Sequence, residues 1–263
     1  MGFFMEDVSP LAALVGALAV IFLLDELLIR RLVVGRAAGA DVGQRWFFLH
    51  AAANAIICVF GAKDVLTTLA NPAGSMAQDL AWSAVPGGFV AGIHTYHALR
   101  FKLSGADIFH HAAFAGVGCF SNYVVNYGPL ANLYFFFVCG LPGALDYALL
   151  GLVKCGRLAA MEEKRLNSAI NVWLRAPGLT MVFSFAYAAF RTGDHGINAG
   201  IIAVLAFISV HNGQYYLQRV VANYHFKLGL AQGAAAAAAA AQAQGTAAPP
   251  RKKEDAAAGG KAE

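Results

Sequence analysis

Four histidines that lie close together in the chain are the residues whose types and spacing point most directly to chemistry. His94 and His97, in GIHTYHALRFK, are three residues apart, which places both side chains on one face of a helix. His110 and His111 follow in GADIFHHAAFAG, after the short basic stretch RFKLSGAD. Because helices joined by so short a turn run antiparallel, we expect the four imidazoles to lie at similar depth and at least three to converge on one polar pocket.

The sequence leaves three interpretations of this group. The imidazoles can hydrogen-bond to neighbouring helices and lipid head groups without further function, or they can ligate a metal such as zinc or iron. A neutral imidazole can also act as a general base that takes a proton from a hydroxyl or amine nucleophile. We expect no metal and no cofactor, because the remaining histidines do not form the repeated boxes of a membrane di-iron site (His50, His195, His211 and His225).

The composition indicates the solvent around these histidines. The chain is 59% hydrophobic and 13% charged, with a mean hydropathy of +0.57, whereas a soluble domain averages about 25% charged residues. Apolar runs of about 20 residues, the length that crosses the hydrocarbon core of a bilayer, recur along the chain. We therefore predict an all-α fold, a polytopic transmembrane helical bundle. Its spans, about seven in number, are expected at residues 9–29, 46–68, 84–101, 107–126, 131–153, 168–190 and 197–218.

The placement of basic residues predicts the orientation of this bundle. With the N-terminus luminal or outside, the cytosolic loops hold most of the arginines and lysines, as the positive-inside rule requires, and the C-terminus is cytosolic. No compact basic patch points to nucleic acid. Beyond Leu230 the chain is Ala-rich and of low complexity. We expect residues 1–230 to form the bundle and residues 231–263 to form a disordered cytosolic tail, in which the alanine run can form a frayed helix.

Other polar side chains inside the expected spans are candidates for function, because an ionisable group there costs about 2.5–3.5 kcal/mol. Asp146 and Arg175 either pair across helices, or Arg175 reaches the cytosolic interface with its aliphatic stem in lipid. Asn212, in HNGQYYLQ, indicates a cavity lined by the last span. Lys63 and Asp64 are expected to end the second span as a local pair.

The order and spacing of these segments resembles the TLC-domain family of multi-spanning membrane proteins, which includes ceramide synthases and lipid-regulating proteins. RWFFLHAAANAIICVFG is similar to the opening helix of that family, and GGFVAGIHTYHALRF to the segment before its paired histidines. DIFHH is similar to the pair itself, FSNYVVNYGPLANLYFFF to the stretch that follows, and HNGQYYLQRVV to the closing helix. The resemblance covers most of residues 45–227.

The resemblance implies a lipid-handling protein of the endoplasmic reticulum, with membrane lipids and acyl-CoA as partners. On this basis the candidate catalytic residues are His110, His111 and Asp146. One histidine would be the general base, and Asp146 would orient its ring or stabilise its charged form. The candidate substrate-binding residues are His94, His97, Asn126, Arg175 and Asn212. The chain departs from the ceramide-synthase branch in FFFVCGLPGALDYALLGLVK, which keeps an aspartate and a lysine but lacks the His–Asp dyad of that branch.

The sequence therefore leaves three functions to compare. The first is binding or handling of lipid in an intramembrane pocket, with a role in membrane lipid homeostasis, and the missing dyad favours it. The second is a membrane N-acyltransferase that uses acyl-CoA and a His–His general base, which the retained histidine pair favours. The third is a transporter or channel, for which inverted repeats and broken helices are typical; the sequence offers only the GLPG interruption.

Overall fold

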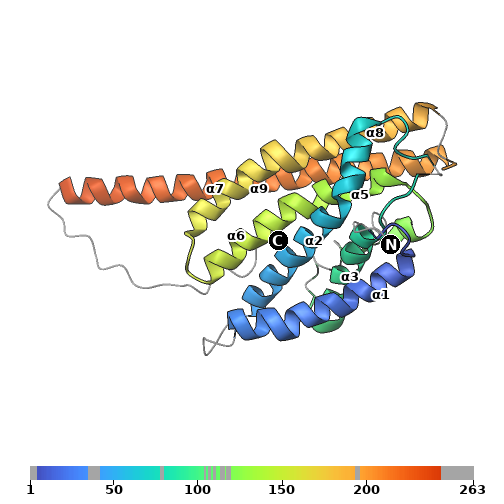
Figure 1. Cartoon of the computed structure of the whole chain (residues 1–263). Coiled ribbons are helices and arrows are strands. Elements are labelled where there is room, and N and C mark those ends of the chain that lie inside the picture. Colours follow the sequence, from blue (N-terminus) through green and yellow to red (C-terminus); the bar gives the residue numbers. More distant parts are fainter. Residues whose placement is uncertain are drawn as a thin grey trace.

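The fold is built from helices, as Figure 1 shows. The computed structural model describes residues 5–34, 42–77, 80–103, 105, 108, 111–112, 116, 120–192 and 196–243, and none of these lies in a strand. The all-α prediction is confirmed for this part of the chain. The elements are α1 (Pro10–Leu23) with a π-helical continuation (Leu24–Val34), α2 (Val42–Ala70), α3 (Val85–Arg100), a 3₁₀ turn (Phe120–Tyr123), α5 (Pro129–Phe135), a π-helical turn (Phe136–Gly140), α6 (Leu141–Lys154), α7 (Ala160–Ile170), a second π-helical turn (Asn171–Arg175), α8 (Ala176–Thr192) and α9 (Ala199–Ala243).

Three helical stretches are long and apolar enough to cross a membrane, namely Pro10–Arg31, Gln44–Ala70 and Pro129–Lys154. Large apolar side chains such as Leu11 and Leu66 remain two-thirds exposed on their outer faces. A protein in water rarely exposes such faces over whole helices, whereas lipid tails are a suitable solvent for them. The chain is therefore an integral membrane protein by the length and composition of its helices.

The expectation of seven spans is not confirmed. Most of the expected fourth span, residues 107–126, lies outside the described residues. The part of it that is described ends in the 3₁₀ turn Phe120–Tyr123 and a short irregular segment rather than in an α-helix. α3 is a 16-residue helix, and α7 and α8 join through a π-helical turn into one long helix.

Small residues let the helices approach one another closely. α1 and α3 run parallel, with Gly88 against Ala13 and Gly92 against Ala17; a Cβ atom at position 88 would lie 2.7 Å from the backbone carbonyl of Ala13. In a membrane, such backbone contact replaces the hydrophobic drive that holds helices together in water. α2 and α6 pack antiparallel, with glycines of α6 against side chains of α2. α8 packs along α9.

The two π-helical turns each precede a proline by two residues, at Pro142 and Pro177. A proline inside a helix has no N–H to donate and crowds the carbonyl four residues earlier. The wider turn relieves that crowding, so the helix Pro129–Lys154 continues through the GLPG sequence instead of breaking there. The two turns also contact each other and α9.

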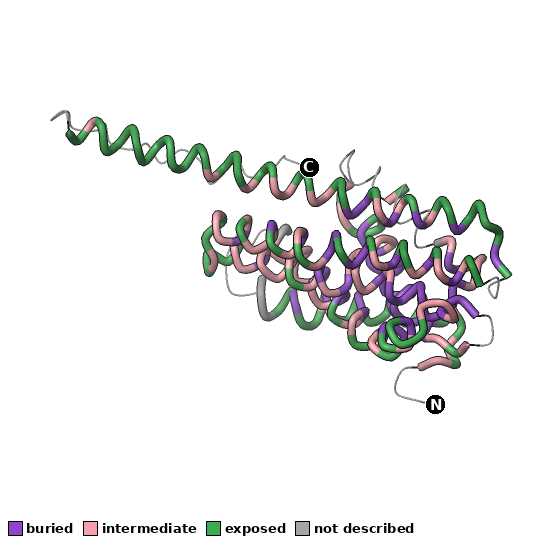
Figure 2. The backbone as a smooth tube through the Cα atoms, turned by 90° about the horizontal axis from the view of Figure 1, so that it is seen from above, coloured by how far each residue is buried: buried purple, intermediate pink, exposed green. Residues whose placement is uncertain are grey.

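The expected tail is helical as far as Ala243. α9 is a single helix of 45 residues that extends well past the bundle (Figure 1). From Gly229 to Ala240 every residue is exposed, and Figure 2 shows this projecting arm in green. Alanine has the highest helix propensity of all residues, so an alanine run favours helix over disorder. Residues 244–263 of the expected tail lie outside the described residues.

Asp64 and Lys63 do not form the expected local pair. Lys63 pairs with Glu6, which precedes α1. Asp64 is 1% exposed and accepts hydrogen bonds from the Ser83 backbone N–H at 2.9 Å and from Asn132 Nδ2 at 2.6 Å. This carboxylate therefore connects α2 to the start of α3 and to α5, at the end of the bundle where α1 begins.

Candidate functional site

Histidine side chains of α2 and α3 and the side chain of His111 converge at the end of the bundle where α1 ends. The ring centroids of His94 and His111 are 5.0 Å apart, those of His97 and His111 are 5.1 Å apart, and those of His50 and His97 are 6.3 Å apart. Trp46 lies between two of these rings, 3.5 Å from His50 and 3.7 Å from His97. We call His50, His94, His97 and His111 the histidine cluster.

The cluster agrees with the expected convergence of three imidazoles and adds one that the sequence interpretation missed. His94, His97 and His111 lie together as expected, whereas His110 lies outside the described residues. His50 is one of the four histidines that form no repeated box in the sequence. The sequence does contain a pattern that places it: in RWFFLH, His50 follows Trp46 by four residues, so the two rings share one face of a helix.

The hydrogen bonds of the cluster assign the proton on two of its rings. Nδ1 of His50 lies 3.2 Å from the Trp46 carbonyl oxygen, and Nδ1 of His94 lies 2.7 Å from the Val90 carbonyl oxygen. A carbonyl oxygen only accepts, so each Nδ1 carries the hydrogen and donates it. In the neutral ring Nε2 is then the acceptor nitrogen, which is the arrangement of a general base.

An ionic network positions the helices that carry the cluster. Asp25, fully buried at the end of α1, accepts from Arg45 Nη2 at 2.6 Å and from the Tyr96 hydroxyl at 2.5 Å. Glu26 accepts from Arg45 Nη2 at 2.7 Å and from Arg100 Nη2 at 2.6 Å. The network joins α1, the start of α2 and the end of α3, next to the histidines. The sequence interpretation did not single out these two acids.

Asp146 lies on α6, next to Tyr147, and is not a member of the histidine cluster. The adjacent Tyr147 stacks near His50, with ring centroids 4.4 Å apart. Asp146 itself forms no hydrogen bond or ion pair with a histidine among the described residues, and its Oδ1 atom is buried without a partner. Its charged neighbours are Arg175, Glu163 and Lys164. Among the described residues no contact supports the role expected for Asp146, orienting a histidine, and the candidate His110 lies outside them.

Arg175 forms no ion pair with Asp146 among the described residues, and it is buried in the bundle. Its side chain is 9% exposed, Nη1 donates to Asn171 Oδ1 at 2.9 Å, and Nε has no partner. Asn171 in turn donates to Asn167 Oδ1 at 2.7 Å, and Asn167 lies 3.4 Å from Glu163 Oε1. A row of polar side chains thus runs from Glu163 to Arg175, along one face of α7 and of the π-helical turn that follows it.

The two expected asparagines lie apart from the histidine cluster. Asn212 is 3% exposed on α9, where the neighbouring Gly213 packs against Ala176, and its Oδ1 atom has no partner. Asn126 lies in the irregular segment before α5. Its Oδ1 accepts from the Gly128 backbone N–H at 2.9 Å, which fits a turn with Gly128 at a φ of +61°. The structure therefore gives Asn126 a role in the turn.

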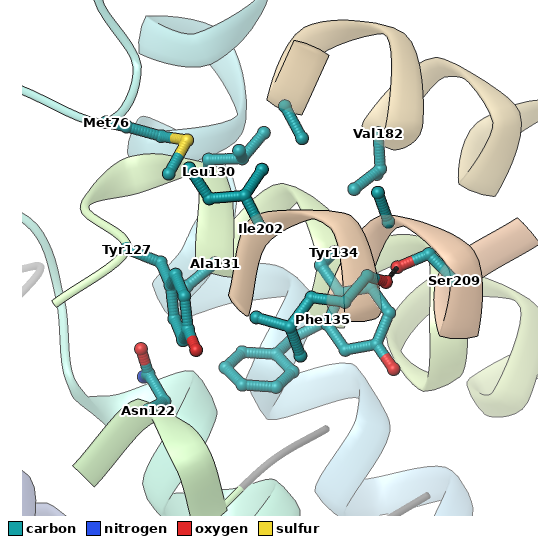
Figure 3. A pocket seen from close by; sticks show the side chains of 13 residues that line it. Met76, Asn122, Tyr127, Leu130, Ala131, Tyr134, Phe135, Val182, Ile202 and Ser209 are labelled. Carbon is teal, nitrogen blue, oxygen red and sulfur yellow. Dashed lines mark hydrogen bonds between the residues drawn. The ribbon is translucent and has the colours of Figure 1, made fainter. Parts of the chain in front are cut away.

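An apolar cavity lies among α5, α8 and α9 (Figure 3). The cavity is partly open, and buried residues such as Val182, Ile202 and Ala206 line it. On the helix Pro129–Lys154 it lies beside Phe135, and Tyr147 of the histidine end follows about 18 Å further along the axis. The sequence predicts a cavity lined by the last span beside Asn212; this cavity is lined by α9, but Asn212 is not one of its lining residues.

No arrangement of three or more histidine, cysteine, aspartate or glutamate side chains among the described residues could hold a metal ion. The imidazoles of the cluster stack on aromatic rings and bond to carbonyls, which suits hydrogen bonding and proton transfer. No protein-family model, curated protein or solved structure matches this chain.

Proposed function

We propose that this integral membrane protein binds and handles lipid, with the histidine cluster as the polar site for the lipid head group. The observation that carries this proposal is the convergence of His50, His94, His97 and His111 inside a helical bundle whose outer faces are apolar. Imidazoles at membrane depth are costly unless they serve a function. A head group that donates and accepts hydrogen bonds is a suitable ligand for neutral rings. The resemblance to the TLC-domain family supports the same proposal.

The charges around the cluster support a cytosolic position for this site. Arg30, Arg31, Arg45 and Arg100 lie at the same end of the bundle as the cluster, around the end of α1, the start of α2 and the end of α3. Under the positive-inside rule this end faces the cytosol, where acyl-CoA is available. We further propose membrane lipids as partners and the endoplasmic reticulum as the location, on the resemblance stated above.

A second candidate function is acyl transfer, and the proton positions on His50 and His94 favour it. In this reaction the acceptor nitrogen of a ring takes the proton of an amine or hydroxyl as that nucleophile attacks the thioester carbonyl of acyl-CoA. The carbon–sulfur bond then breaks, and the imidazolium returns the proton to the departing thiolate. The product is an amide or ester and free CoA, so atoms and charge balance without a cofactor.

Lipid mass spectrometry on the purified protein separates these functions. Wild type, His111→Ala and the His110→Ala/His111→Ala double variant are incubated with acyl-CoA and a sphingoid base, and products and co-purified lipids are measured. His225→Ala is the matched control, because His225 is exposed on α9 outside the cluster. A histidine-dependent N-acyl product supports acyl transfer. A co-purified lipid that the His111→Ala variant loses, without turnover, supports lipid handling. Neither product nor histidine-dependent lipid overturns both.

A further inference from the structure

The cavity among α5, α8 and α9 contains an unusual combination of an apolar lining and unpartnered polar atoms. Asn122 is 7% exposed and Tyr127 is 8% exposed, and both line the cavity. Asn122 Oδ1 and the Tyr127 hydroxyl have no hydrogen-bond partner. In Figure 3 both side chains lie at the same side of the cavity. Such atoms cost free energy when they are buried and unpaired, so they indicate what a ligand would supply.

The other polar groups of the lining are already satisfied or lie elsewhere. Ser209 donates its hydroxyl to the Leu205 carbonyl of its own helix at 2.7 Å. The Ser121 hydroxyl lies near Tyr127 but does not meet hydrogen-bond geometry with it. Among the described lining residues, the buried polar atoms without a partner are therefore Asn122 Oδ1 and the Tyr127 hydroxyl, and most of the other lining side chains are apolar. The Ser121 hydroxyl is likewise unpartnered, but Ser121 does not line the cavity.

We propose that this cavity binds the end of a single apolar chain that carries a hydroxyl group, with the hydroxyl donating to Asn122 Oδ1 and accepting from the Tyr127 hydroxyl. One hydroxyl both donates and accepts, so it satisfies both atoms at once. The chain contacts the apolar side chains of α8 and α9. The site lies at the other end of the bundle from the histidine cluster and does not depend on the function proposed for that cluster.

The polar end of the ligand decides the selectivity of this site. An apolar chain gains little by moving from lipid tails into an apolar cavity, because the two surroundings are alike. A hydroxyl that has no partner in the hydrocarbon core gains two hydrogen bonds in the cavity. A long-chain alcohol should therefore bind, and the ether of the same length, which cannot donate, should compete poorly.

Photocrosslinking tests this assignment on the full chain in phosphatidylcholine nanodiscs. The probe is a long-chain alcohol with a diazirine beside its hydroxyl, and the labelled peptides are mapped by mass spectrometry. We expect label within residues 120–135 or 199–209, removed by excess 1-dodecanol and much less by dodecyl methyl ether. Asn122→Leu and Tyr127→Phe should each weaken labelling about 2- to 10-fold, the loss of one hydrogen bond. Ala206→Phe, which fills the cavity, should abolish it.

Matched controls keep the result interpretable. Tyr187→Phe removes a hydroxyl from an exposed tyrosine of α8, and Val204→Phe adds bulk at an exposed position of α9; neither residue lines the cavity, so labelling should not change. Tyr127→Phe preserves the shape of the side chain, so it covers the case in which Ala206→Phe fails to fold. Equal competition by the ether, labelling that persists in folded Ala206→Phe protein, or label spread over lipid-facing residues would each overturn the proposal.

Discussion

Replacing Asp25 tests whether the ionic network holds the helices of the histidine cluster in place. Asp25 is fully buried and accepts from both Arg45 and Tyr96. Asp25→Leu leaves the Arg45 guanidinium without its main partner. Removing one member of a buried ion pair costs about 3–5 kcal/mol. The Arg45 side chain is 17% exposed and keeps Glu26 as a partner, so the lower end of this range, about 3 kcal/mol, applies.

The Tyr96 hydroxyl adds to this loss, because it too is left without an acceptor, at about 1 kcal/mol. The expected total for Asp25→Leu is thus about 4 kcal/mol. The double variant Asp25→Leu/Arg45→Leu removes both charges, and replacing a buried ion pair by apolar side chains is often neutral. Glu26 loses Arg45 but keeps Arg30 and Arg100 as partners. The main remaining cost is the orphaned Tyr96 hydroxyl, so the double variant should lose about 1 kcal/mol.

Equilibrium unfolding in mixed micelles with increasing sodium dodecyl sulfate, followed by far-ultraviolet circular dichroism, measures these differences. Glu162→Gln is the control, because Glu162 and Arg165 form an exposed pair outside the network, and stability should not change. The reasoning is refuted if Asp25→Leu unfolds like wild type. It is also refuted if the double variant is as unstable as the single one.

Three further predictions concern packing, anchoring and accessibility. Gly88→Val should separate α1 from α3 and lower the unfolding midpoint, since its Cβ would meet the Ala13 backbone, whereas Gly16→Ala, with open space around it, should not; a thermal melt of both decides. Asp64→Leu should destabilise by about 1–3 kcal/mol, because the Ser83 N–H loses its acceptor; an unchanged unfolding curve would contradict the anchoring role. Cys155 is exposed, whereas Cys58 and Cys139 are partly buried. An impermeant maleimide applied to folded protein should therefore modify Cys155 before Cys58 and Cys139, and peptide mapping that found Cys58 modified before Cys155 would refute this order.

The sequence predicted those features that depend on periodicity and composition. The helical class and the apolar stretches follow directly from local pattern, and so does the meeting of His94 with His97, since three residues of spacing fix a helix face. Contacts such as those of Asp64 with Ser83 and Asn132 join residues far apart in the chain, and no local rule reveals them. A buried carboxylate such as Asp25 also looks, in sequence, like the ordinary polar end of a span.

Two regions differ from the simplest sequence expectation because local effects compete. The composition of the tail cannot bury a core, which indicates disorder or a frayed alanine helix, but helix propensity needs no core, and α9 continues through the alanine run. Charge alone allows Arg175 either to pair with Asp146 or to reach the interface. Instead Asn171, one turn before Arg175, accepts a hydrogen bond from Nη1 of the guanidinium. The cavity beside Asn122 arises from the way three helices fit together, which no sequence window contains.

The projecting end of α9 has a mechanical consequence. Helix formation is limited by its first turn, and further residues add with little penalty once that turn exists. The bundle supplies the turn, so the arm from Gly229 to Ala243 grows from an anchored helix and needs no partner of its own. At 1.5 Å per residue the arm is about 21 Å long. It acts as a stiff spacer that sets how far from the bundle the following chain begins, and a helix-breaking proline in the alanine run would shorten that distance without touching either candidate site.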